Sequence, residues 1–268
     1  MLKPKNRTIE IDKNWDADVS GGQYLDHVLQ RVSAKNIKFS NTDFRYSIFD
    51  GCYFRDCIFD SCDFTGCKFL GTNFHGSKFI GCKFEYASFE RTLIESDVLD
   101  SCCPGSENLK MRFARTLRMN YQSLGDSASV NKAILVELDS TKVHFYKAWH
   151  SNESYYRKKY HGWQRLHYFL SWLKFWVLDF LWGNGEKPIK LVRSVCLLLV
   201  LIAFIDTIAY RDPRLVSNFL QALLDSPQVF LGTKLSSFPG IIIALITFVR
   251  LVVFGLFLSI LIRRFARR

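Results

Sequence analysis

The spacing of apolar residues changes twice along the chain, and its first part is the most regular. From Phe39 to Phe89 a phenylalanine occurs at every fifth residue, and Ile94 and Leu99 continue the register. Small or short side chains stand two residues before most of these positions. Neither an α-helix nor a regular strand explains a period of five, because their side-chain periods are 3.6 and 2. The pattern predicts a coil in which every fifth side chain points inward.

This register resembles that of the pentapeptide-repeat family, in which a small residue, a polar residue and then Leu or Phe recur. The resemblance implies a right-handed quadrilateral β-helix over residues 36–103, with about four pentads per coil and about three coils, so that the stack is about 15 Å tall. We expect residues 1–35 to form an N-terminal cap. Pro104-Gly105 is expected to end the register, because proline cannot donate to a strand ladder.

Seven of the eight cysteines fall inside this repeat, and four of them would lie one per face around a single coil. These four are Cys52, Cys57, Cys62 and Cys67. Four thiolates are formally a zinc-ligand set, but the phenylalanine rings of the same coil would fill the space that tetrahedral zinc needs. We interpret them as small buried apolar residues and expect no metal and no cofactor. Cys62 and Cys82 would stack near disulfide distance, yet the polar start of the chain predicts a reducing cytosolic compartment for this half.

Charge is divided unevenly between the two halves of the chain. The formal net charge is +11, but residues 36–103 hold seven basic and ten acidic side chains, whereas residues 104–268 hold 23 basic and ten acidic ones. Some acidic β-helices of the family mimic duplex DNA and bind a topoisomerase. The excess of three acidic residues is weak for that role, because a mimic must reproduce a dense array of phosphates.

From Glu107 the apolar period becomes helical. Apolar residues recur every three or four positions up to Leu124, Gly125 follows as a C-cap, and Asp126 or Ser127 can begin a second helix. Residues 104–160 are therefore predicted to form a helical hairpin connector. Its basic side chains favour either a solvated face or attraction to an anionic inner leaflet, and no groove-reading motif indicates nucleic acid. These side chains are Lys110, Arg112, Arg115, Arg118, Arg157, Lys158, Lys159 and Arg165.

Residues 161–190 contain an aromatic segment, WQRLHYFLSWLKFWVLDFLW, that begins at Trp163. It also holds four polar groups, which would be costly inside a membrane span. These groups are Arg165, His167, Lys174 and Asp179. We predict an amphipathic helix that lies in the membrane interface and is anchored by its tryptophans.

Residues 191–268 contain two apolar runs, at about 191–210 and 241–262, and each would be about 30 Å long as a helix, the hydrocarbon thickness of a bilayer. Basic residues precede the first run and follow the second, so both termini are expected to be cytoplasmic. The flanking residues are Lys187, Lys190, Arg193, Arg263, Arg264, Arg267 and Arg268. The predicted location is a bacterial inner membrane that the chain crosses twice.

Between the two runs, Val216–Leu224 is expected to be a short half-helix and Gln228-Val229-Phe230-Leu231-Gly232 a pore-loop-like segment. This plan resembles the potassium-channel superfamily, and more closely bacterial membrane proteins that join pentapeptide repeats to such a domain. The shared landmarks are DFLWGNGEKP, NFLQALLDSPQVFLG and RLVVFGLFLSILIRRFARR. The segment departs from a TVGYG-like filter because it has one glycine and a bulky Phe230. Gly255 lies where inner helices of channels often have a hinge.

Two charges fall inside the predicted spans, Asp206 about 6 Å and Arg250 about 14 Å from the outer end. Unpaired charges at such depth are costly, so both should face protein or water. A structural pair or subunit contact, an ion pathway and snorkelling are the three alternatives.

The predicted fold is thus a multidomain membrane protein: a β-helix, a helical hairpin connector and a two-transmembrane α-helical channel-like domain. The six histidines show neither metal-ligand spacing nor a nucleophile motif, and we expect them at surfaces and no enzymatic activity. The predicted function is a homo-oligomeric ion pore, a tetramer if channel-like, with the β-helix as its cytosolic sensing or docking part. The alternative is a non-conducting membrane-anchored scaffold whose β-helix binds a protein partner.

Overall fold

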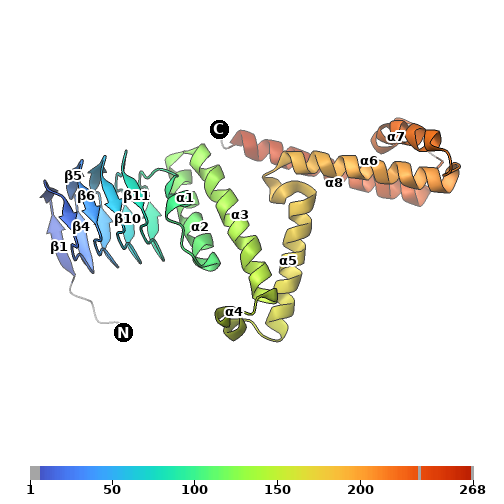
Figure 1. Ribbon diagram of the computed structural model, residues 1–268. Coiled ribbons are helices and arrows are strands. Elements are labelled where there is room, and N and C mark those ends of the chain that lie inside the picture. Colours follow the sequence, from blue (N-terminus) through green and yellow to red (C-terminus); the bar gives the residue numbers. More distant parts are fainter. Residues whose placement is uncertain (1–6, 235–236, 267–268) are drawn as a thin grey trace. The chain divides into compact units, whose positions relative to one another are not determined.

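The computed structural model describes residues 7–234 and 237–266, with side chains up to Ile262. The chain divides into two compact units, residues 1–168 and 169–268, and the division falls inside one helix. The first unit holds the strands and the helices that follow them, and the second holds the long apolar helices (Figure 1).

Short parallel strands build the N-terminal region and stack into three sheets (Figure 1). The sheet orders are β1-β4-β7-β10-β12, β11-β9-β6-β3 and β2-β5-β8. The strands are β1 (Thr8–Ile11), β2 (Asn14–Trp15), β3 (Val19–Ser20), β4 (His27–Gln30), β5 (Ser33–Lys35), β6 (Lys38–Ser40), β7 (Ile48–Asp50), β8 (Tyr53–Arg55), β9 (Ile58–Asp60), β10 (Lys68–Leu70), β11 (Lys78–Ile80) and β12 (Ser88–Glu90). Paired residues are twenty positions apart, as in Phe49 with Phe69. Four pentads therefore complete one coil, which confirms the predicted β-solenoid.

The core of the solenoid consists of stacked phenylalanine columns. Phe39, Phe59 and Phe79 lie with successive ring centroids 4.9 and 5.0 Å apart and nearly parallel. Rings of neighbouring columns meet edge to face, and each such aromatic pair adds about 0.5–1.5 kcal/mol beyond its burial. Most of the small residues of the pentads donate hydrogen bonds to the preceding coil, as Cys67 Sγ does to Phe44 O (2.9 Å) and Ser77 Oγ to Phe54 O (3.0 Å). These positions therefore select a short donor.

The solenoid begins earlier than predicted. Strands β1, β2 and β3 pair in parallel with β4, β5 and β6, so the coil starts at Thr8 and most of the segment expected to be a cap is a coil itself. The five-stranded sheet is consequently about 19 Å across its strands instead of the expected 15 Å. At this end Lys13 Nζ lies 5.7 Å from the centre of the Trp15 ring and 6.0 Å from that of Tyr24.

Helices α1 (Val98–Ser101) and α2 (Glu107–Leu124) close the other end, and α1 begins before the expected stop at Pro104. The Phe113 ring lies on the last core rings, 5.6 Å from Phe84 and 6.0 Å from Phe89. The Asn120 side chain accepts a hydrogen bond from Thr92 N (2.8 Å) and donates one to Thr92 O (2.7 Å). It thus takes the place of the next strand.

Helix α2 turns at Gly125, whose φ of 74° is left-handed, into α3 (Ser127–His150). Asp126 caps α3 by accepting a hydrogen bond from Ser129 N (3.1 Å). The two helices pack as a hairpin, and α4 (Ser154–Lys159) follows. Phe113, Leu117 and Val130 of the hairpin join the same apolar core as the solenoid.

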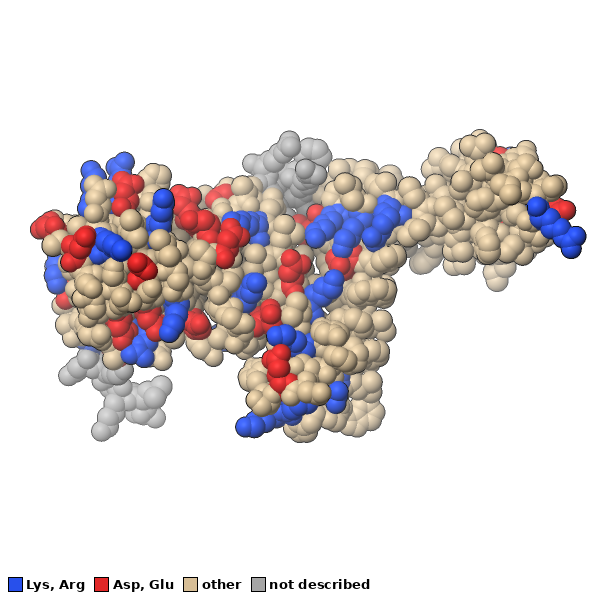
Figure 2. Space-filling view, viewed as in Figure 1, with Lys and Arg blue, Asp and Glu red and all other residues tan. Residues whose placement is uncertain are grey.

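The chain continues through α5 (Trp163–Trp182), a short 3-10 turn η1 (Gly183–Gly185), α6 (Pro188–Tyr210), α7 (Val216–Leu231) and α8 (Gly240–Ala266). Helices α6 and α8 are each long and apolar enough to cross a membrane. On the face shown in Figure 2, charged side chains cover the strand region, whereas α6 to α8 are almost free of them except at their ends.

Candidate functional site

A strip of aromatic side chains runs along one corner of the solenoid. Tyr46 and Tyr86 are 50% and 61% exposed and occupy the same corner position two coils apart. Gly66 lies between them, and a Cβ there would be 2.6 Å from the Tyr46 ring, so this ring lies directly over the glycine. The Arg112 guanidinium is 5.6 Å from the centre of the Tyr86 ring. Exposed Tyr and Arg side chains are typical of binding hot spots.

Charges on the solenoid surface are mixed and mostly paired. Arg45 and Asp43 form a bidentate ion pair, in which Nη2 and Oδ2 are 2.7 Å apart. Its hydrogen bonds lower the pKa of Asp43. Arg31 and Asp12 form a similar exposed pair at 2.7 Å. Exposed pairs of this kind contribute little to stability, about 0–1 kcal/mol.

Four of the basic residues named for the connector make contacts within their own unit, and the solvated face and the attraction to an anionic leaflet both stay predictions. Arg115 and Arg118 contact Glu137 of α3 at 2.8 and 3.0 Å. Arg157 donates to Ala148 O (2.9 Å) and Arg165 to Trp149 O (2.6 Å). These last two cations lie at the C-terminus of α3, where the helix dipole favours positive charge.

His144 is buried, contrary to the expectation of a surface position. Its Nδ1 lies 3.4 Å from the Tyr156 hydroxyl and its Nε2 3.4 Å from that of Tyr160. Burial, followed by nearby Lys159, lowers the pKa of His144. The signal in the sequence was helical spacing, because Ser140 and Ala148, one turn away on either side, are buried as well.

The thiols of the described residues are all free. Cys52 is buried in the solenoid, and this burial raises its pKa to about 11. Cys62 and Cys82 are buried and interact with each other, as predicted from their spacing. Among the described residues, no group of three or more His, Cys, Asp or Glu is placed to hold a metal ion.

The junction of α5 and α6 pairs one of the polar groups that made α5 unsuited to a span, Asp179. Lys190 Nζ contacts Asp179 Oδ1 at 2.7 Å, and Ser194 Oγ donates to Leu181 O at 2.7 Å. Arg193 donates to Phe180 O. Side chains of α6 thereby satisfy the C-terminal carbonyl groups of α5. No side chain of α5 is buried in the structure.

The predicted pore-loop-like segment is helical, which corrects the expectation of an extended filter. Helix α7 runs through Pro227 to Leu231, so residues 228–231 belong to it and Gly232 is its left-handed C-cap, with φ of 75°. Proline removes the N–H that would bond to Leu223 O, and Ser226 Oγ donates to that carbonyl instead (2.9 Å). The helix therefore continues where the sequence indicated a break.

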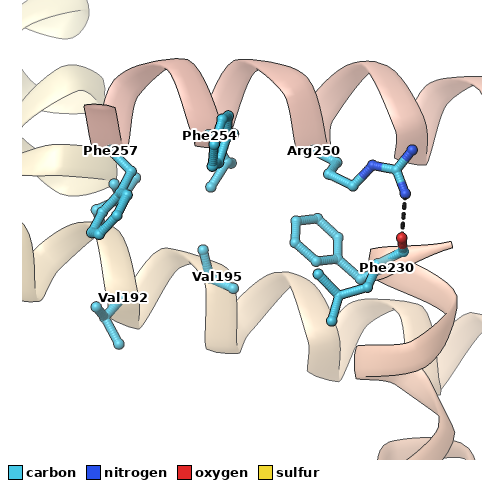
Figure 3. A pocket seen from close by; sticks show the side chains of 9 residues that line it. Val192, Val195, Phe230, Arg250, Phe254 and Phe257 are labelled. Atoms are coloured by element: carbon cyan, nitrogen blue, oxygen red, sulfur yellow. Dashed lines mark hydrogen bonds between the residues drawn. The ribbon is translucent and has the colours of Figure 1, made fainter. Parts of the chain in front are cut away.

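Arg250 caps the C-terminus of α7. Its Nη1 donates to Leu231 O at 2.5 Å, and a Cβ on Gly232 would lie 2.5 Å from the same nitrogen (Figure 3). Beside this contact lies an apolar cavity of about 260 Å³ between α6 and α8, closed at one end by Phe230 (Figure 3). Its other lining residues include Val192, Val195, Phe254 and Phe257.

A structural pair between Asp206 and Arg250 was one expectation, and the structure does not contain it. Asp206 contacts Arg211 Nε at 2.8 Å, and Arg211 Nη2 in turn contacts Asp225 at 2.9 Å. Asp225 also accepts Lys234 Nζ at 2.6 Å. The four side chains link the end of α6 to α7 and to the segment after it.

Gly255 lies within an unbroken α8, and a Cβ there would meet nothing within 4 Å. Close packing within the chain therefore does not account for it, and the hinge stays a prediction.

Comparison with known proteins identifies the repeats. Two models of pentapeptide repeats match residues 27–68 and 57–94, so this part of the solenoid consists of pentapeptide repeats. No curated protein matched the chain. Solved structures that resemble it include two trypsin-treated variants of QnrB1, a plasmid-mediated fluoroquinolone resistance protein, at 19% and 15% identity and TM-scores of 0.15 and 0.13. The matches cover 33% and 32% of this chain and 54% and 62% of those chains.

Proposed function

We propose that this protein is a membrane-anchored docking protein, whose solenoid binds a protein partner while α6 and α8 hold it in the bilayer. The observation that carries the proposal is the exposed strip of Tyr46, Tyr86 and Arg112 on a solenoid that α2 closes at its C-terminal end. A stacked aromatic core keeps such a surface in one conformation. Binding then costs little ordering entropy, which favours affinity.

The membrane anchor follows from length and exposure. Helix α6 has 23 residues and α8 has 27, about 35 and 40 Å at the rise of an α-helix. In α6 only 22% and in α8 0% of the most apolar stretch is buried, which leaves large apolar surfaces that water would not tolerate. Lys187, Lys190 and Arg193 at the start of α6 favour a cytoplasmic position for that end.

This assigns the protein to an inner membrane that it crosses twice, with the solenoid on the cytoplasmic side. The charges predicted to follow the second span belong to side chains outside the described part of the chain. They are Arg263, Arg264, Arg267 and Arg268. The assignment of both termini to the cytoplasm thus relies on the positive-inside rule alone.

Site-specific photo-crosslinking tests the docking surface. A photoreactive amino acid would replace Tyr46 or Tyr86 in the full-length protein expressed in its own membranes, with Tyr53 as the matched control. Tyr53 is 41% exposed on a different face of the solenoid. We expect one discrete crosslinked protein from positions 46 and 86 and none from position 53. Equal crosslinking at all three positions, or none at any, would contradict the proposal.

A pore of several copies, tetrameric if channel-like, is the second candidate, and the position of the end of α7 favours it. Arg250 is ten residues beyond Gly240, about 15 Å along α8 and close to the middle of a span. Because Arg250 contacts Leu231, α7 would be a half-helix that ends near mid-depth, without an extended filter. Discrete currents in planar bilayers, altered by Arg250→Ala or Phe230→Ala, are the expected result. A folded oligomer that passes no current would eliminate this candidate.

A further inference from the structure

The charges in the second unit do not balance around Arg250. Asp206 and Asp225 together neutralise Arg211 and Lys234, so that network has no net charge. Among the residues that the structure describes, no carboxylate forms an ion pair with Arg250, whose contact is the carbonyl of Leu231. The C-terminus of a helix supplies only about half a negative charge. A positive remainder is therefore left on Arg250.

The depth of Arg250 makes this remainder costly. The proposed placement of α8 puts it near the middle of the bilayer, where an uncompensated charge costs at least about 2.5–3.5 kcal/mol. A guanidinium has five N–H donors. Leu231 O occupies one of them, so most of the donors are available to another acceptor.

A second cavity lies next to this guanidinium. It has a volume of about 320 Å³ and is lined by Thr233, Lys234, Thr247 and Arg250, together with Gly232 and apolar side chains. The polar lining thus consists of two cations and two hydroxyl groups. The Thr233 hydroxyl already donates to Gln228 O (3.2 Å), and Lys234 Nζ contacts Asp225 Oδ1 (2.6 Å). Arg250, Thr247 and the remaining N–H groups of Lys234 can donate hydrogen bonds into the cavity. No carboxylate lines this cavity. The apolar cavity on the other side of Phe230 has Arg250 as its single charged lining residue.

We propose that this polar cavity binds a small inorganic monovalent anion such as chloride. A positive remainder on Arg250 is what the region leaves uncompensated, and the donors that line the cavity suit a spherical anion. A lipid phosphate is a poorer match, because its headgroup would have to lie about 15 Å inside the hydrocarbon region. The inference rests on the membrane placement proposed above and adds a ligand to it.

Chloride binding is measured directly by the line width of the ³⁵Cl NMR signal. The full-length protein would be reconstituted in nanodiscs of zwitterionic lipid, and chloride titrated against gluconate at constant ionic strength. We expect saturable broadening that bromide reverses. Arg250→Gln should weaken binding at least about tenfold, because it removes a charge-assisted hydrogen bond. Arg214→Gln, the matched control in the segment between α6 and α7, should leave binding unchanged.

Two further variants separate loss of the site from loss of the fold. Arg250→Lys keeps the charge and should retain weakened binding. Lys234→Gln removes the second cation without touching the Leu231 contact and should also weaken binding. Broadening that does not saturate, or that Arg250→Gln and Lys234→Gln leave unchanged, overturns the inference while the membrane proposal stands. Protein that fails to enter nanodiscs overturns both, whereas displacement of chloride by an added fatty acid alone would assign the cavity to a lipid carboxylate.

Discussion

The closure of the solenoid by Asn120 leads to a stability prediction that can be worked from the structure. Asn120 and Thr92 are 2% and 0% exposed, and two hydrogen bonds of 2.8 and 2.7 Å join the side-chain amide of the first to the backbone of the second. Asn120→Ala would leave a buried N–H and a buried C=O without partners. Each such group costs about 1–3 kcal/mol, so we expect the free energy of opening of the last coil to fall by about 2–6 kcal/mol.

Amide hydrogen exchange measured by mass spectrometry reports this change locally in the full-length protein. A loss of about 2–6 kcal/mol corresponds to exchange about 30 to 20,000 times faster in peptides that contain Thr92. Asn108→Ala is the matched control, because Asn108 lies on the same helix and makes a surface hydrogen bond with the Tyr155 hydroxyl (3.3 Å). If both variants exchange at the same rate, Asn120 does not replace a strand and the reasoning is wrong.

Three other substitutions test the core, the end of α7 and the buried histidine. Phe64→Ala removes a ring that stacks 5.1 Å from Phe44 and 5.0 Å from Phe84, and should lower the free energy of unfolding by about 3–5 kcal/mol, measured by denaturant titration; a loss below that of an exposed Tyr→Ala change would disprove the stacked core. Gly232→Ala places an alanine with left-handed backbone against Arg250, and should lower the free energy of unfolding by at least about 1–2 kcal/mol, measured by thermal unfolding in detergent. Gly255→Ala should be neutral or stabilising, and the reverse order would contradict the capping contact. His144 has a lowered pKa in the folded protein, so the unfolded chain binds more protons and stability falls as pH drops below 6.5, the ordinary histidine value. His144→Phe should remove this pH dependence, and the exposed control His75→Asn should keep it.

The solenoid was predictable because a period of five restricts the chain to one kind of coil. Its first turn was missed since Val19, Tyr24, Leu29 and Ala34 hold the same register without phenylalanine. Apolar volume at the inward position, and not the identity of the side chain, defines the coil. Val19 and Leu29 pair with Phe39 and Phe49 of the next coil, so these residues are sufficient.

The partners of the polar side chains were less predictable, because they depend on contacts between distant residues. The expected half-helix ended at Leu224, but the Ser226 hydroxyl donates to Leu223 O, the carbonyl that Pro227 cannot bond, and the helix continues to Leu231. Their depth in the predicted spans indicated an ion pair between Asp206 and Arg250. Arg211, one residue past the end of α6, is closer in the fold to Asp206, and the helix end at Leu231 is closer to Arg250.

The reactivity of Cys196 tests most directly whether α6 lies in a membrane. This thiol is exposed in the folded chain and lies eight residues after Pro188, about 12 Å along α6, while the other described thiols are buried or half-buried. Membranes that contain the full-length protein would be permeabilised so that a water-soluble maleimide reaches both of their faces. Labelling would be measured before and after denaturation in detergent. We predict that lipid protects Cys196 until denaturation. Rapid labelling of Cys196 in membranes before denaturation would contradict the membrane anchor. Recovery of the protein in solution without detergent would contradict it as well.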